Sequence, residues 1–177
     1  MKASHAETWH LSEPRMEMAR RIAVGRNSPK LGRVRNKRET KRASDYEINF
    51  VGACAEIAVC DRFQFPVDPT FCLGGDKGAP DLYVGDMGIE VKAATHYPPI
   101  LKFNRLGDWK PGSMAVVLCH INNRAPSVVN LCGVVFRQEF FSDHFVEDFG
   151  YGPRFCFSAA DMAPVKVLDE MDARIDL

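Results

Sequence analysis

Runs of apolar residues separated by polar segments predict several helices and strands in this chain of 177 residues. Asp45 to Phe63 is rich in Ala, Ile, Val and Phe and has no proline, so we expect a mostly buried helix capped by Ser44 or Asp45. Ser113 to Ile121 and Val128 to Phe136 are long runs rich in Val and Leu, typical of two buried strands joined by a turn. The order of helical and strand segments predicts an α/β fold.

Shorter patterns predict four further elements. Ser12 to Val24 is expected to be a helix that ends at Gly25. Phe63 to Phe71 can supply an edge strand, because its two prolines cannot donate to the hydrogen bonds of a sheet. Ile100 to Leu106 and Arg137 to Phe145 can each form a short helix, the second with an aromatic face.

The residues that follow Asp81 form two short β-prone runs around a Gly-Asp-Met-Gly turn, which predicts a hairpin. If residues 85–86 form the loop, Asp81 lies opposite Glu90; if residues 86–87 form it, Asp81 lies opposite Lys92. Side chains alternate along a strand with a period of two, so both registers place Asp81, Glu90 and Lys92 on one face of the sheet.

These three side chains combine the groups that metal-dependent hydrolysis of a phosphodiester needs. Two neighbouring carboxylates repel each other unless one is protonated or a divalent cation neutralises them, and hard oxygen ligands favour Mg²⁺ or Mn²⁺. A lysine beside them can orient or deprotonate an attacking water while the metal acts as a Lewis acid. The alternative is an exposed hairpin with solvated charges, because short motifs of common residues have many accidental matches.

Glu56 is a carboxylate in the middle of the expected buried helix. Helical spacing places it on one face with four small or medium-sized residues: Asn49, Gly52, Ala53 and Cys60. Such a face can approach a sheet closely and deliver one carboxylate to it. An isolated buried charge is very costly, so Glu56 is expected either to meet a cation or to pair with a base such as Arg62 or Arg105.

Taken in order, three motifs resemble the PD-(D/E)xK nuclease superfamily, including its small phage and prokaryotic members and the archaeal-type Holliday-junction resolvases. The motifs are Gly52-Ala53-Cys54-Ala55-Glu56, Gly74-Gly75-Asp76 leading to Pro80-Asp81, and Glu90-Val91-Lys92. The resemblance covers residues 49–92 by motif and extends to about residue 140 by the order of elements alone. It implies a restriction-endonuclease-like core of a helix, a three-stranded antiparallel meander, a second helix and a further strand.

The resemblance also implies a role for each residue of the motifs. Asp81, Glu90 and the Val91 carbonyl would bind Mg²⁺, for which Mn²⁺ is expected to substitute. Lys92 would be the catalytic lysine, and Glu56 would support this metal or a second one. Whether one metal or two are bound stays open.

Three further residues near the motifs are weaker candidates for contact with DNA. Asp76 is most simply a turn residue, but its place shortly before Asp81 resembles a stretch that lines the cleft in related nucleases. Thr95 and Lys102 follow the strand of Glu90 and can touch a phosphate.

A net charge of zero conceals one strongly basic segment. From Arg15 to Arg42 there are eleven Lys or Arg residues against Glu17 and Glu39, a net charge of +9. Within this segment, Arg26 to Arg42 has few apolar residues, so we expect it to form a loop or to become ordered only when a partner binds. The candidate contacts to DNA phosphates are Arg26, Lys30, Arg33, Arg35, Lys37, Arg38, Lys41 and Arg42. Such contacts add affinity without sequence selection; the alternative is an arm that only solubilises the protein or packs on its acidic body.

Composition places the chain in the ordinary globular range, with 46% hydrophobic and 26% charged residues. No run approaches the ~18 to 20 apolar residues that a membrane helix needs, and residues 1–10 lack the apolar stretch of a signal peptide. We therefore expect a cytoplasmic protein with no membrane partner. None of the six cysteines forms a Cys-x2-Cys pair, so free thiols are expected.

Together these features predict a nuclease domain over residues 45–177, preceded by a basic arm over residues 1–44. The expected function is metal-dependent hydrolysis of phosphodiester bonds in DNA by an endonuclease. Two alternatives stay open: a nuclease specific for junctions or flaps, and a non-catalytic nucleic-acid-binding protein that has kept the nuclease fold. The choice between DNA and RNA and the oligomeric state, including a homodimer, are also open.

Overall fold

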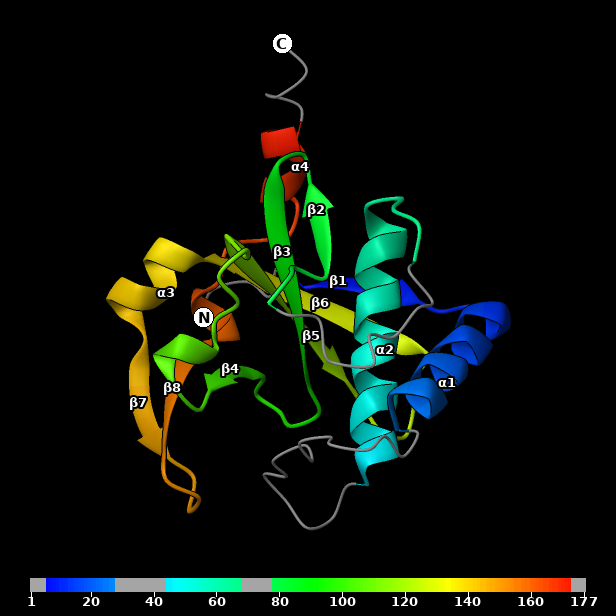
Figure 1. Ribbon diagram of the computed structural model, residues 1–177, viewed down its shortest axis with the longest axis horizontal. Coiled ribbons are helices and arrows are strands. Elements are labelled where there is room, and N and C mark those ends of the chain that lie inside the picture. Colours follow the sequence, from blue (N-terminus) through cyan, green and yellow to red (C-terminus); the bar gives the residue numbers. More distant parts are fainter. Residues whose placement is uncertain (1–5, 28–43, 68–77, 173–177) are drawn as a thin grey trace.

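The fold is mixed α/β, with a central five-stranded sheet that carries helices on one face and a smaller sheet on the other (Figure 1). The computed structural model describes residues 6–27, 44–67 and 78–172. Within these residues, no helix combines the length and apolar character needed to cross a membrane. The prediction of an α/β fold is confirmed at this level.

The described strands form two sheets. The central sheet has the order β1-β6-β5-β3-β2, and its neighbouring strands are antiparallel except for the parallel pair β3 and β5. Its strands are β1 (Glu7–His10), β2 (Leu82–Val84), β3 (Met87–Ala94), β5 (Ala115–Ile121) and β6 (Val128–Phe136). The smaller sheet is antiparallel and has the order β4-β8-β7. Its strands are β4 (Ile100–Phe103), β7 (Phe145–Asp148) and β8 (Pro153–Ser158).

The helices complete two hydrophobic cores, one on each face of the central sheet. They are α1 (Glu13–Asn27), α2 (Asp45–Arg62), α3 (Arg137–Asp143) and α4 (Val167–Asp172), with short 3₁₀ turns at Leu106–Asp108 and Ala159–Asp161. α1 and α2 pack together on one face, while α3 follows β6 and packs with the smaller sheet (Figure 1). None of the five cysteines among the described residues forms a disulfide, as predicted; Cys72 lies outside them.

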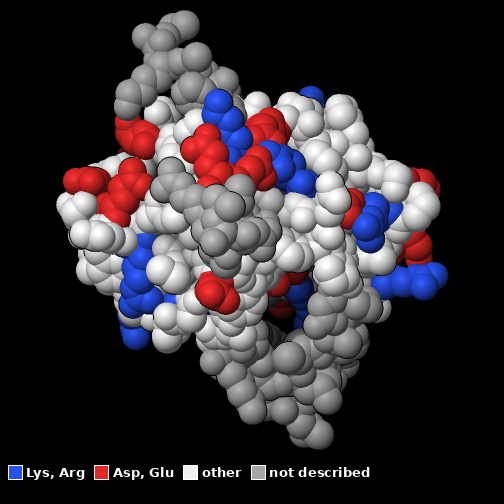
Figure 2. Space-filling view, turned by 90° about the horizontal axis from the view of Figure 1, so that it is seen from above, with Lys and Arg blue, Asp and Glu red and all other residues white. Residues whose placement is uncertain are grey.

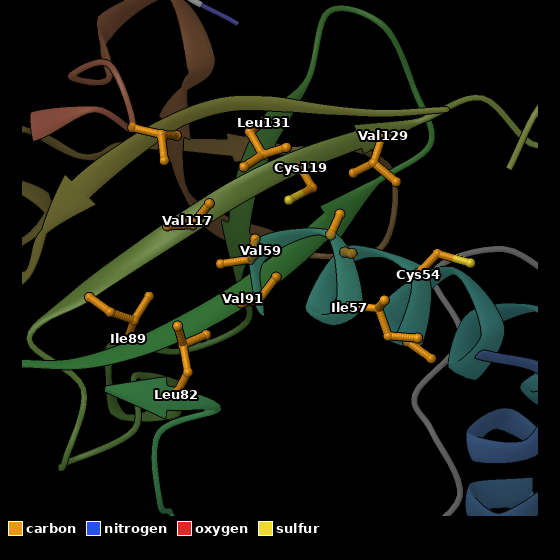
Figure 3. Close-up of a cluster of buried hydrophobic side chains, with 14 of the residues drawn as sticks. Cys54, Ile57, Val59, Leu82, Ile89, Val91, Val117, Cys119, Val129 and Leu131 are labelled. Atoms are coloured by element: carbon orange, nitrogen blue, oxygen red, sulfur yellow. The ribbon is translucent and has the colours of Figure 1, made fainter. Parts of the chain in front are cut away.

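α2 is the helix that the apolar composition predicts. A capping box closes its N-terminus: Glu47 N–H donates to Ser44 Oγ at 3.2 Å, and Ser44 N–H donates to Glu47 Oε2 at 2.6 Å. Its buried face packs against the central sheet, where Figure 3 shows Val59 close to Val91 and Val117. Burial of this apolar face holds the helix on the sheet.

Alternation along β3 sends its side chains into two different environments. Val91 points into the core formed with α1 and α2, so Glu90 and Lys92 point to the opposite face. The parallel register pairs Glu90 with Val116 and Lys92 with Leu118, and both of these apolar partners belong to the second core. The candidate side chains therefore face the smaller sheet rather than α2.

β2 and β3 form the predicted hairpin, with Gly85-Asp86 as the loop. Leu82 pairs with Ile89, and Asp81 N–H donates to the Ile89 carbonyl at 2.9 Å. Gly85 has φ of 56°, which suits the first loop position of a type II′ turn. Of the two registers that the sequence allows, this is the one that sets Asp81 opposite Glu90.

Residues 6–27 belong to the folded body, although they fall within the arm predicted for residues 1–44. β1 extends the central sheet beside β6, and α1 packs against α2, with Ile22 buried in their common core. The predicted helix is present, but it continues to Asn27 instead of ending at Gly25. Gly25 is itself buried, and packing there outweighs the weak helix preference of glycine.

Two further predictions need correction. Residues 63–67 form a turn and irregular chain instead of the start of an edge strand, and residues 68–71 of that prediction lie outside the described residues. The predicted helix at residues 100–106 is wrong, because residues 100–103 form β4. Leu101 and Phe103 are buried with a period of two in the second core, and pairing of β4 with β8 satisfies the backbone. The short helix after β6 is confirmed as α3.

Candidate active site

Asp81, Glu90 and Lys92 meet on one face of the hairpin, and a fourth residue, Lys110, joins them. Lys92 Nζ lies 2.5 Å from Glu90 Oε1. Lys110 Nζ lies 2.8 Å from Asp81 Oδ1 and 2.6 Å from Glu90 Oε2, so one ammonium bridges the two carboxylates. The juxtaposition that the hairpin pattern predicts is present, with formal charges that sum to zero across the four side chains.

The Asp81 carboxylate is held by the strand that it faces. Val91 N–H donates to Asp81 Oδ2 at 2.7 Å, while Oδ1 accepts from Lys110. The Asp81 side chain is 18% exposed, so it is partly shielded but still open to solvent on one side. The Val91 N–H and the Lys110 ammonium therefore orient this carboxylate, and both of its oxygens accept a hydrogen bond.

Glu90 is the most enclosed charge of the cluster, with a side chain that is 4% exposed. Burial raises the pKa of the Glu90 carboxyl above its usual value, and the charge of Asp81 acts in the same direction. The Lys92 and Lys110 ammonium groups oppose this shift by stabilising the charged form. Glu90 thus depends on cations beside it to remain ionised in a site that water hardly reaches.

The two lysines differ in how far they reach into solvent. The Lys92 side chain is 39% exposed, and its Nζ lies 5.9 Å from the centroid of the Phe103 ring on β4. The Lys110 side chain is only 16% exposed. Lys92 is therefore the cation at the open side of the cluster, and Lys110 is the one enclosed between the carboxylates.

Lys110 is placed by a tight contact between its loop and the hairpin. A Cβ atom at Gly88 would lie 2.2 Å from the Gly112 carbonyl oxygen and 2.4 Å from Pro80 Cγ, so only glycine permits this approach. Met114 N–H donates to the Gly88 carbonyl at 2.8 Å and ties the start of β5 to the hairpin. The loop that carries Lys110 is consequently pressed against the strand that carries Glu90.

The neighbours of Lys110 fix the loop from its other side. Trp109 is buried, and its Nε1–H donates to the Ser113 carbonyl at 2.8 Å. Ser113 N–H donates in turn to the Lys110 carbonyl at 3.0 Å. No role for Lys110 was predicted from the sequence. The signal for it is its position between Trp109 and the turn residues Pro111-Gly112.

Glu56 pairs with a base, which is one of the two partners that the sequence leaves open. The base is Arg26 of α1 rather than Arg62 or Arg105: its two terminal nitrogens donate to the two carboxylate oxygens at 2.7 and 2.6 Å. Ala53 and Cys60 of the small face of α2 are buried, but a Cβ at Gly52 would have no heavy atom within 4 Å, so α2 makes no close approach at Gly52. The role of Glu56 in metal binding stays a prediction, and it requires release from Arg26.

α2 nevertheless runs past the start of the hairpin. Burial raises the pKa of the Cys60 thiol to about 11, and the carboxylates of Glu56, Asp61 and Asp81 add to this effect. Carboxylates of the helix and of the hairpin therefore act on the same thiol.

The remaining candidates lie apart from the cluster or outside the described residues. Thr95 is exposed just beyond β3, and Lys102 on β4 places its Nζ 3.8 Å from the centroid of the Phe149 ring. Asp76 lies outside the described residues, as do seven of the eight basic candidates: Lys30, Arg33, Arg35, Lys37, Arg38, Lys41 and Arg42. Their predicted contacts with DNA stay predictions.

The donor set of the cluster fits a small hard cation. Asp81 and Glu90 present carboxylate oxygens, and Mg²⁺ is commonly held by one or two carboxylates together with waters and substrate phosphates. Among the described residues, no group of three or more His, Cys, Asp or Glu side chains could hold a metal ion. The site thus offers two side-chain ligands, and the Val91 carbonyl is the third ligand that the resemblance implies.

Comparison of the chain with models of protein families, with curated proteins and with solved structures gives no match. The likeness to PD-(D/E)xK nucleases therefore stays an expectation that rests on four residues and their order along the chain.

Proposed function

We propose that this protein is a Mg²⁺-dependent endonuclease that hydrolyses phosphodiester bonds of DNA. The observation that carries the proposal is the meeting of Asp81, Glu90 and Lys92 on one sheet face, with contacts between charged atoms of 2.5 to 2.8 Å through Lys92 and Lys110. We also propose that α2, the hairpin and the strands β5 and β6 form a restriction-endonuclease-like core. Part of the expected order along the chain supports this, because α2 precedes the hairpin and β5 and β6 follow it. Where that core has a second helix after the meander, this chain has β4 and a short 3₁₀ turn instead, and residues 63–67 do not form the first strand of the meander.

In the proposed mechanism, each residue has a task that follows from its position. Asp81, Glu90 and the Val91 carbonyl would hold Mg²⁺, which supplies a Lewis acid to the phosphate and the attacking water. The Val91 N–H orients the Asp81 carboxylate, and burial of Glu90 strengthens its attraction to any cation beside it. Lys92, at the open side, positions water for in-line attack and stabilises the negative charge that develops on the phosphate.

One observation favours the alternative of a non-catalytic nucleic-acid-binding protein. Lys92 and Lys110 already neutralise both carboxylates, and such a balanced ion cluster can serve the fold alone. Metal dependence separates the two functions, because an inert ion cluster gives no cleavage with any metal.

We expect the purified protein to cut DNA in Mg²⁺ or Mn²⁺ and to lose all cutting when the metal is chelated. Duplex, single-stranded and four-way branched DNA of the same sequence, with a matched RNA, should be incubated side by side and resolved on denaturing gels. Preference for the branched substrate would identify a structure-specific nuclease. No cleavage of any substrate with either metal would contradict the proposed activity.

The basic segment supports DNA as the substrate. Figure 2 shows Lys and Arg interspersed with Asp and Glu on the described part of one face, so positive charge there is not separated from negative charge. The strongest concentration of positive charge in the chain is at residues 26–42, which carry eight Lys or Arg against a single Glu. Such a segment is suited to contact the phosphate backbone.

Changing Arg33, Arg35, Lys37 and Arg38 together to Ala should weaken DNA binding equally for all sequences. The log–log salt dependence should also flatten by up to ~0.9 for each phosphate of duplex DNA that the variant no longer neutralises. Binding should be measured in Ca²⁺ at several salt concentrations. The matched control removes four basic side chains of the folded body: Arg21, Arg124, Arg137 and Lys166. If the quadruple variant bound DNA with the wild-type affinity and the wild-type salt dependence, this segment would not contact DNA and would only solubilise the protein.

A further inference from the structure

Lys110 occupies the position where a bound metal ion would have to lie. Its Nζ is 2.8 Å from Asp81 Oδ1 and 2.6 Å from Glu90 Oε2, and these oxygens belong to the two carboxylates that the proposed function assigns to Mg²⁺. A Mg²⁺ ion bound to the same oxygens would approach them to about 2.1 Å. Two positive charges cannot share so small a space without strong repulsion.

The backbone of Lys110 is firmly placed, while its side chain is long and flexible. The contact of Gly88 with Gly112 and Pro80, and the burial of Trp109, hold the loop against the hairpin. A lysine side chain has a flexible four-carbon stem, so its ammonium can withdraw without movement of this backbone. Departure of Nζ leaves Glu90 buried and in need of another cation.

We infer that the Lys110 ammonium and a divalent metal ion are alternative counter-ions of the Asp81–Glu90 pair. Together with Lys92, Lys110 keeps the pair neutral when no metal is bound, and the metal must displace the Lys110 ammonium. Lys110 is thus a positioning residue that sets the metal affinity of the site. This inference rests on the proposed metal-dependent function, but its test reads binding rather than cleavage.

The test measures Mn²⁺ binding by isothermal titration to the wild type and to Lys110→Met. Removal of the competing charge should tighten Mn²⁺ binding, with an expected gain of roughly 5- to 150-fold, the usual range for coupled ligands. Thermal unfolding without metal should begin at a lower temperature in Lys110→Met, because Glu90 loses a counter-ion. Added Mn²⁺ should raise that temperature more in the variant than in the wild type.

Two control variants separate charge from other effects. Lys110→Arg keeps the positive charge and should bind Mn²⁺ with nearly wild-type affinity. Lys166→Met removes an exposed lysine that has no role in the proposed site, and it should leave Mn²⁺ affinity unchanged. If Lys110→Met does not fold, Lys110→Gln replaces it, because the amide can still donate to a carboxylate.

The outcomes distinguish this inference from the proposed function. Tighter Mn²⁺ binding by the Lys110 variant than by the wild type supports the inference. If the variant binds Mn²⁺ and the wild type binds none, the inference is still supported, but the proposed metal-dependent function is overturned. Equal or weaker binding by a folded variant, with clear binding by the wild type, overturns the inference and leaves the function standing. No binding by either protein overturns both.

Discussion

Asp81→Asn and Lys92→Ala are each expected to reduce DNA cleavage by at least ~100-fold while the protein stays folded. Asn at position 81 can still accept the hydrogen bond from Val91 N–H, but it lacks the charge that a metal ion needs. Ala at position 92 removes the cation at the open side of the cluster, where the proposed mechanism places the attacking water. Single-turnover cleavage rates and circular dichroism should be measured on the same samples.

Matched variants control for charge changes elsewhere in the protein. Asp86→Asn alters an exposed carboxylate in the hairpin loop, and Lys166→Ala removes an exposed lysine that has no role in the proposed mechanism; both should cleave at nearly the wild-type rate. Asp81→Asn should also weaken Mn²⁺ binding. Near-normal cleavage by a folded Asp81→Asn or Lys92→Ala protein would refute the mechanism. Unchanged Mn²⁺ affinity in Asp81→Asn would show that Asp81 is not a metal ligand.

Gly88→Ala is expected to destabilise the protein by about 2 kcal/mol or more, within the upper range for overpacked positions. The added Cβ would lie 2.2 Å from the Gly112 carbonyl oxygen and 2.4 Å from Pro80 Cγ, and neither atom belongs to a long flexible side chain that can move aside. Either the hairpin or the loop of Lys110 must shift. Urea unfolding should show the destabilisation as a lower midpoint.

Gly52→Ala is the matched control for this prediction. A Cβ at Gly52 would have no heavy atom within 4 Å, and the residue lies inside α2. Alanine there should stabilise the protein by roughly 0.5–1 kcal/mol, because glycine is a poor helix former. If Gly88→Ala proved as stable as the wild type, the close contact between hairpin and loop would not exist as described.

Gly88→Ala also tests how Lys110 is placed. If the loop shifts, Lys110 should lose its bridge between Asp81 and Glu90, and Mn²⁺ affinity should change in the direction expected for Lys110→Met. Measuring Mn²⁺ binding on Gly88→Ala under conditions where it is folded therefore links the packing of the loop to the chemistry of the site.

Local patterns are sufficient to predict the long elements. The buried helix follows from a proline-free apolar segment with a Ser44 cap, and the strands β5 and β6 follow from runs of Val and Leu. The prediction of a helix at residues 100–106 is wrong because so short a segment does not separate the helical period from the strand period. The strand form of residues 100–103 depends on pairing with β8, more than fifty positions further along the chain.

The sequence predicted the shared face of Asp81, Glu90 and Lys92, because both two-residue loops that it allows, 85–86 and 86–87, place the three side chains on the same side. The partners of these charges were decided by tertiary structure alone. Lys110 reaches Asp81 across 29 positions, and Arg26 reaches Glu56 across 30. Both contacts depend on how helices and loops pack against the sheet, and Lys110 in particular depends on the close approach at Gly88. No local pattern encodes such an approach, because it arises only when segments distant in the chain compete for the same space.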